Sequence, residues 1–232
     1  NICVGSHDPL LEWALREADT GMAVNFGGSV DGLERMQKSE AVMAGIHLRD
    51  GVSNQDGDGS AQYNVESTNR YLGGQPVVLI EWARRQQGLI VPPGNPLGID
   101  GVRALKGHKI IGRQHKAGSF LLLQSLIEEA GLTIGDLTFV SPDARTEDDV
   151  ALAVAEGQAD AGLGIAAVAR KHRLDFVSLT LERYDLVIWR PGYFEPPVQA
   201  LFAFTATPRF MGKAAALGYD IANLGRVHYN AP

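Results

Sequence analysis

Three short turns rich in glycine and serine, each between a strand-like run and a helix-like run, constrain this chain most. The turn at 112–119 follows the apolar run 109–111 and opens a helical segment at 119–130, and similar turns lie at 5–9 and 27–29. The first turn of a helix has unpaired backbone N–H groups and a partial positive charge, so it suits an anion. The sequence therefore predicts one small anion held by donors from separate parts of the chain.

Composition excludes several classes of function. The 232 residues fit one large domain or two lobes, and the net charge of −6, without a Lys/Arg cluster, argues against direct nucleic-acid contact. A single cysteine, Cys3, excludes an internal disulfide and a cysteine-built zinc site. No apolar run approaches the roughly 18 residues of a membrane span, and no signal peptide is visible. The compartment, cytoplasmic or extracytoplasmic, depends on what precedes Asn1.

The first eighty residues alternate between strands and helices. Strands are expected at 1–4, 22–26 and 41–46, with helices starting at Asp8-Pro9 and covering 31–39. This order predicts a parallel, helix-covered sheet, in which ligands bind beyond the carboxyl ends of the strands. Ser6, Ser29 and His47 fall at those ends. The simpler interpretations are that each serine caps a helix and that His47 ends a strand.

Residues 50–62 are rich in Gly, Asp and Ser, which predicts a surface loop. Asn54, Asp56 and Asp58 imitate the start of a calcium-binding loop. Val65, however, stands where the bidentate glutamate should be, so no calcium site is expected.

A second set of strands and helices covers about 86–178, and long extended connections near 80–88 and 178–188 separate it from the rest. We therefore expect an α/β fold with two lobes, 1–82 with 184–232 and 83–183. Two hinge segments would join them around a cleft. The second lobe would supply Arg113, Gly118 and Ser119 as donors. Tyr184, on the return connection, would donate its hydroxyl across the cleft, or pack at the hinge.

Other chemical motifs are weaker. Ser6, His7 and Asp8 are consecutive and do not predict a catalytic triad, because a triad is a spatial arrangement. His7 with Asp8, or His47 with Asp50, lacks a third metal ligand at a telling spacing, so no metal site and no cofactor is expected. The glycines at 162 and 164, followed by Ala167 and Glu182, match a dinucleotide fingerprint loosely. We interpret these glycines instead as a strand–helix turn that faces a cleft.

Several strings of residues resemble one family in the right order and over nearly the whole chain. These strings lie at 5–11, 28–29, 44–48, 88–96, 113–114, 118–119, 159–165 and 183–188. The sequence resembles the periplasmic-binding-protein-like (type 2) substrate-binding domain. This family is related to molybdate- and tungstate-binding proteins and also occurs fused to helix-turn-helix and molybdopterin-biosynthesis domains. The resemblance implies two α/β lobes with a ligand in the cleft.

The function expected from this resemblance is non-catalytic binding of a small oxyanion, molybdate or tungstate first, with hinge closure. The partner would be an ABC transporter or a fused DNA-binding domain outside this chain. Two alternatives stay open. One is a ligand-sensing effector domain of a transcriptional regulator that binds a small organic or molybdopterin-related ligand. The other is a nucleotide- or pterin-related enzyme.

Overall fold

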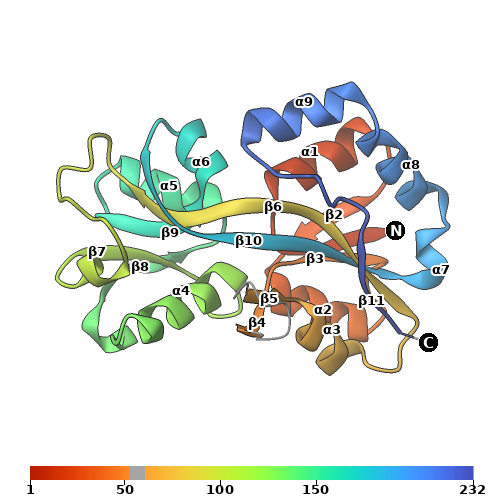
Figure 1. The fold of residues 1–232 in the computed structure, drawn as a ribbon, viewed down its shortest axis with the longest axis horizontal. Coiled ribbons are helices and arrows are strands. Elements are labelled where there is room, and N and C mark those ends of the chain that lie inside the picture. Colours follow the sequence, from red (N-terminus) through yellow and green to blue (C-terminus); the bar gives the residue numbers. More distant parts are fainter. Residues whose placement is uncertain (53–60, 232) are drawn as a thin grey trace. The chain divides into compact units, whose positions relative to one another are not determined.

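The computed structural model describes residues 1–52 and 61–231, and it divides into two compact units (Figure 1). Unit 1 comprises Asn1–Arg84 and Glu182–Pro232, and unit 2 comprises Arg85–Leu181. The chain passes between the units inside two long strands, β6 (Val77–Val91) and β10 (Asp175–Trp189). The extended connections expected near 80–88 and 178–188 lie inside these two strands, each of which is 15 residues long.

Unit 1 contains the parallel arrangement predicted from its first three strands. Strand β1 pairs in parallel with β2 and β3, while β10 pairs antiparallel with β3, in the order β2-β1-β3-β10-β6. Strand β11, which the sequence did not predict, pairs with β6. The remaining elements are β1 (Ile2–Gly5), β2 (Ala23–Phe26), β3 (Met43–Ile46), β11 (Val227–Asn230), α1 (Pro9–Glu17), α2 (Ser29–Gln37), α3 (Val65–Leu72), α7 (Arg190–Tyr193), α8 (Pro196–Thr205) and α9 (Pro208–Leu217).

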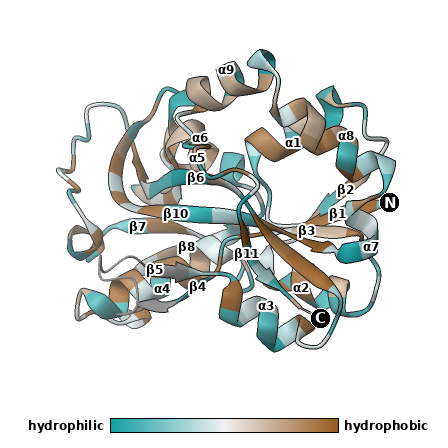
Figure 2. Ribbon diagram, turned by 45° about the vertical axis from the view of Figure 1, so that its right-hand side comes forward, coloured by the Kyte–Doolittle hydropathy of each residue, from teal (hydrophilic) through white to brown (hydrophobic). Residues whose placement is uncertain are grey.

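Helices cover both faces of the unit 1 strands, with α1, α8 and α9 on one side and α2 and α3 on the other (Figure 1). On the α2 side, Val4, Leu33 and Val187 belong to one buried apolar cluster. On the other side, Trp82 packs edge-on against Phe210 with ring centroids 5.4 Å apart. Strand β3, buried throughout, is hydrophobic in Figure 2. Burial on both faces explains why these strands appear in the sequence as continuous apolar runs.

The loop prediction for 50–62 was wrong at both ends. Strands β4 (Arg49–Val52) and β5 (Ala61–Tyr63) form a two-stranded antiparallel sheet. The Asp50 carboxylate accepts from the backbone N–H of Glu66 at 2.8 Å and from the Ser67 hydroxyl at 2.6 Å, at the start of α3. This contact ties Asp50 of β4 to the N-terminus of α3. The calcium-like residues at 54–59 lie outside the described part of the chain.

Unit 2 is built on a sheet in the order β6-β9-β7-β8, with β7 parallel to both neighbours. Helix α4 lies on one side of it and α5 and α6 on the other (Figure 1). A capping box begins α5, because the Thr146 hydroxyl accepts from Asp149 N and the Asp149 carboxylate accepts from Thr146 N. The elements are η1 (Val102–Leu105), β7 (Lys109–Arg113), α4 (Gly118–Glu129), η2 (Ile134–Asp136), β8 (Thr138–Ala144), α5 (Glu147–Ala155), β9 (Ala161–Ile165) and α6 (Ala166–Lys171).

Candidate functional site

Three polar residues follow the carboxyl ends of neighbouring strands or begin the next helix in unit 1. Ser6 follows β1, His47 follows β3, and Ser29 begins α2. Their side chains connect, because Ser6 Oγ lies 2.8 Å from His47 Nε2 and the backbone N–H of His47 donates to Ser29 Oγ at 3.2 Å. All three are buried. The structure thus brings together the three residues that the strand–turn–helix pattern placed at this edge.

Helix capping does not account for either serine. Asp8 caps α1, since Asp8 Oδ1 accepts from Leu11 N at 2.8 Å. Ser29 is the first helical residue of α2, whose cap is Gly28 with φ of 123°, and α2 has no side-chain cap. Within residues 1–52 and 61–231, the backbone N–H groups of Ser29 and Val30 donate to no acceptor. The start of α2 therefore offers unpaired donors of the kind that suit an anion.

A continuous hydrogen-bonded chain runs from Ser6 through His47 to Glu182. Ser6 Oγ contacts Nε2 of the ring, and Glu182 Oε2 lies 2.9 Å from Nδ1. The side chains of His47 and Glu182 are 1% and 0% exposed. The sequence suggested a serine, a histidine and an acid only as the consecutive residues 6–8, whereas the structure forms such a chain from residues distant in sequence. Because His47 and Glu182 are out of contact with water, the ring nitrogens of His47 find their hydrogen-bond partners in this chain of side chains.

Tyr184 supports this chain from β10. Its ring stacks on His47 with centroids 5.9 Å apart and planes at 17°. Its hydroxyl donates to the carbonyl oxygen of Ser6 at 2.5 Å. A phenol has one proton to donate, so in this structure the proton predicted for the ligand is already engaged. Tyr184 orients Ser6 and His47 here, and its direct ligand contact remains a prediction.

A second buried polar cluster lies beside His47. The Asn64 side chain donates to Asp185 Oδ2 at 2.8 Å and accepts from Leu48 N at 2.6 Å, and Arg183 Nε donates to the same carboxylate at 2.9 Å. Burial raises the pKa of Asp185 to about 6, although Arg183 and Asn64 act in the opposite direction. Loss of hydration therefore outweighs the partners of this carboxylate.

The raised pKa of Asp185 makes stability depend on pH. The folded pKa of about 6 exceeds the ordinary 3.8, so the stabilisation is fully present below pH 3.8 and is lost as pH rises through 6. Relative to Asp185→Asn, the wild-type protein should gain up to about 3 kcal/mol of unfolding free energy between pH 7 and pH 4. Urea denaturation at several pH values measures this. A difference between the two proteins that stays constant with pH would contradict the expectation.

Unit 2 holds the other predicted donors. Gly118 and Ser119 begin α4, and in the described ranges neither backbone N–H nor the Ser119 hydroxyl has a hydrogen-bond partner. Arg113 is buried, with only 6% of it exposed. Its Nη1 donates to Glu147 Oε1 at 2.9 Å and its Nη2 donates to Arg145 O at 2.8 Å. Glu147 and Arg145 thus hold Arg113 within unit 2, and among the described residues its Nε has no hydrogen-bond partner.

Sequence reasoning missed Glu182, Asn64 and Glu147. Glu182 entered only as part of a nucleotide fingerprint, and its contact with His47 spans 135 positions. Glu147 is the first residue of α5, and its burial could not be predicted from the sequence. Apart from the residue types themselves, no local pattern marks these partners.

The dinucleotide pattern does not have the required context. Gly162 and Gly164 lie inside β9, not at a strand–helix turn, so our interpretation of them as a turn was also wrong. A methyl group at Gly162 would lie 2.5 Å from Val150 Cγ1, and one at Gly164 would lie 2.7 Å from Ile90 Cδ1. Close packing explains both glycines. In the described ranges no group of three or more His, Cys, Asp or Glu residues is arranged to hold a metal.

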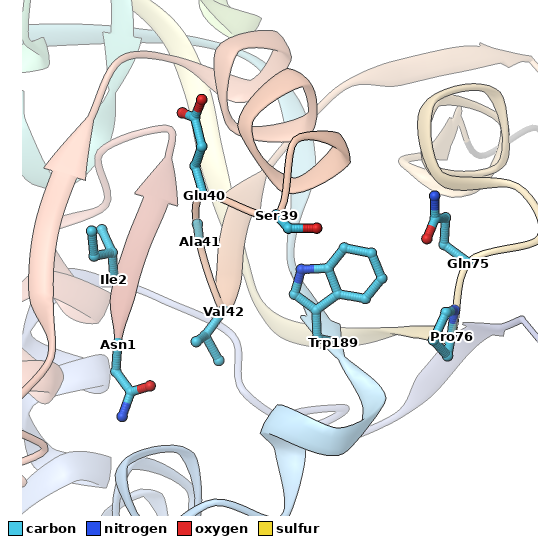
Figure 3. A pocket seen from close by; sticks show the side chains of 9 residues that line it. All are labelled: Asn1, Ile2, Ser39, Glu40, Ala41, Val42, Gln75, Pro76 and Trp189. Carbon is cyan, nitrogen blue, oxygen red and sulfur yellow. The ribbon is translucent and has the colours of Figure 1, made fainter.

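A pocket of about 550 Å³ in unit 1 lies away from the predicted residues. Figure 3 shows Asn1 and Ile2 at the start of β1, Val42 just before β3, and Trp189 at the end of β10 around it. Ser6 and His47 follow the opposite ends of β1 and β3. This pocket is therefore separate from the candidate site.

The comparisons with known proteins identify the family. Over 165 residues the chain is 32% identical to the protein YvgK of Bacillus subtilis, described as uncharacterized, covering 70% of this chain and 51% of YvgK. The chain thus spans about half the length of this curated relative.

Among residues 1–52 and 61–231, none of the helices has both the length and the apolar composition of a membrane-spanning segment.

Solved structures share the fold at low identity. A phosphate ABC transporter substrate-binding protein from Clostridium perfringens, described as putative and holding phosphate, matches with a TM-score of 0.66 at 12% identity, over 94% of this chain and 98% of that one. The tungstate ABC transporter structure from Geobacter sulfurreducens matches with a TM-score of 0.60 at 14% identity, over 91% and 95%. The PBP superfamily domain model matches residues 12–206. The chain belongs to the PBP superfamily and has the α/β fold of periplasmic binding proteins over nearly its full length.

Proposed function

We propose that this domain is a non-catalytic receptor for a small oxyanion, with tungstate or molybdate as the first candidates. The Ser29 hydroxyl is the observation that carries the proposal. It is buried and accepts from His47 N, so its own proton must point elsewhere, and in the described ranges that proton has no acceptor. A buried donor without an acceptor is costly unless a ligand supplies one. The unpaired N–H groups at the start of α2 support the same position for the anion.

The choice of an anion is also supported by the kinds of protein that share the fold. The matched structures include a protein with bound phosphate and a tungstate transporter. We propose donors from both units, with Ser6 and Ser29 in unit 1 and Arg113, Gly118 and Ser119 in unit 2. Hinge closure on the ligand and an ABC transporter partner are parts of the same proposal.

Titration calorimetry of the Ser29→Ala/Ser119→Ala variant tests the proposal. We expect oxyanion affinity to fall at least about tenfold, because two hydrogen bonds to a charged ligand are lost. Ser125→Ala, which alters a half-buried serine later in α4, is the matched control and should bind as the wild-type protein does. Equal affinities for the double variant and the wild-type protein would contradict the assignment of these serines.

A second candidate function is acyl transfer, favoured by one observation. Ser6 Oγ, His47 and Glu182 are connected through the same ring nitrogens as the serine, histidine and acid of a hydrolase. An activated Ser6 would react covalently with a fluorophosphonate probe, and mass spectrometry would locate the adduct. An adduct on Ser6 of wild-type protein, absent in Ser6→Ala, would favour hydrolysis. No adduct would favour the receptor.

A further inference from the structure

The proton positions around His47 decide what Ser6 can offer to a ligand. Nδ1 of the ring lies 2.9 Å from Glu182 Oε2. A carboxylate only accepts hydrogen bonds, so Nδ1 carries a proton in both charge states of the ring. The state of Nε2, 2.8 Å from Ser6 Oγ, is then the only variable.

The two states of Nε2 give Ser6 opposite roles. In the neutral ring Nε2 has a lone pair, so the Ser6 hydroxyl donates its proton to His47 and presents only lone pairs elsewhere. In the charged ring Nε2 donates to Ser6 Oγ, and the hydroxyl proton is free for another acceptor. A fully deprotonated oxyanion such as tungstate can only accept. Ser6 can therefore bond to it only when His47 is charged.

We propose that binding of a fully deprotonated oxyanion at Ser6 is coupled to the uptake of one proton by His47. This inference rests on the proposed receptor function and specifies how the site is regulated. An oxyanion that carries its own proton, such as monohydrogen phosphate, donates to Ser6 Oγ instead and binds beside the neutral ring. The serine–histidine–glutamate chain thus makes affinity for tungstate, but not for monohydrogen phosphate, fall as pH rises, because each tungstate that binds at Ser6 requires one proton.

The proton uptake by His47 has to be distinguished from protonation of the other ionisable groups around it. Glu182 and Tyr184 contact it from β10, Ser6 from the end of β1, and Ser29 from α2. Next to these, Asp185 is held by Arg183 and by Asn64, whose side chain also bonds to Ile46 O and Leu48 N on either side of His47. Because burial raises the pKa of Asp185 to about 6, its carboxylate can itself exchange a proton near neutral pH. Asp185→Asn removes this exchange.

Calorimetric titration of the full chain with sodium tungstate at pH 8, in two buffers of different ionisation enthalpy, measures the protons taken up. We expect uptake approaching one proton for tungstate and close to zero for phosphate. Affinity for tungstate should fall up to tenfold per pH unit in the alkaline part of the range. Asp185→Asn should retain the uptake, and so should His108→Gln, a control histidine in unit 2 whose side chain is 29% exposed.

Two variants test the assignment to His47. His47→Gln cannot titrate, so tungstate should bind without proton uptake and with an affinity independent of pH. Ser6→Ala removes the hydroxyl that couples the ring to the ligand and should also abolish the uptake without disturbing the fold. Tungstate binding without uptake in the wild-type protein would overturn this inference and leave the receptor function standing. No binding of any oxyanion between pH 6 and pH 8 would overturn both.

Discussion

Gly5→Ala is expected to be among the most damaging single substitutions in this chain. Gly5 ends β1 with φ of 97°, a conformation that residues with a side chain rarely adopt. A methyl group there would lie 2.2 Å from the carbonyl oxygen of Gly45, the residue that pairs with Gly5 on the adjacent parallel strand. Neither the backbone of β1 nor that of β3 can move aside without breaking the pairing of the two strands.

Two separate penalties add at Gly5. The strained conformation costs about 1–3 kcal/mol and the overlap with β3 costs about as much again, so we expect a loss of about 2–6 kcal/mol. Such a loss is a large share of the stability of a typical domain. Urea denaturation measures it, or the fraction of soluble protein if the variant does not fold.

Gly21→Ala is the matched control for Gly5→Ala. Gly21 also has positive φ, 64°, but a methyl group there would meet nothing within 4 Å. It should cost only about 1 kcal/mol, the strain of the backbone alone. Equal losses for the two variants would show that the contact between β1 and β3 does not limit residue 5.

Part of the candidate site could be predicted because local sequence signals mark it. Ser6 and His47 are one residue beyond β1 and β3, and Ser29 follows a glycine turn. Strand periodicity and glycine positions are local signals, so they located these three residues at one edge. The start of α2 was predicted at Asp31, whereas the helix begins two residues earlier, at Ser29, with Gly28 as its cap.

The partners of these residues could not be predicted in the same way. Glu182 and Tyr184 reach Ser6 and His47 because β10 lies antiparallel to β3, and strand order is a long-range property. Their segment was interpreted as a connection, since its pattern is extended without a turn. The direction in which Tyr184 donates depends on the position of the Ser6 carbonyl, which only the folded chain defines.

Glu147→Ala is expected to destabilise unit 2 by about 3–5 kcal/mol, because it leaves the charge of Arg113 buried without its partner. Arg113 Nη1 donates to Glu147 Oε1 at 2.9 Å, and the two side chains are 6% and 2% exposed. In the described chain, Arg113 Nε and Glu147 Oε2 have no hydrogen-bond partner, so the pair is already incompletely satisfied. Chemical denaturation of the variant measures the loss.

Replacing both partners separates stability from binding. Arg113→Met/Glu147→Leu replaces both charges with large apolar side chains and should recover most of the stability lost in Glu147→Ala. If Arg113 also contacts the anion, the double variant will fold and yet bind tungstate at least about tenfold more weakly, because a charge-assisted bond is lost. Wild-type affinity in the folded double variant would restrict Arg113 to holding β7 and α5 together. The anion would then depend on Ser29, Ser119 and the two helix starts, so geometry rather than an arginine charge would select the ligand.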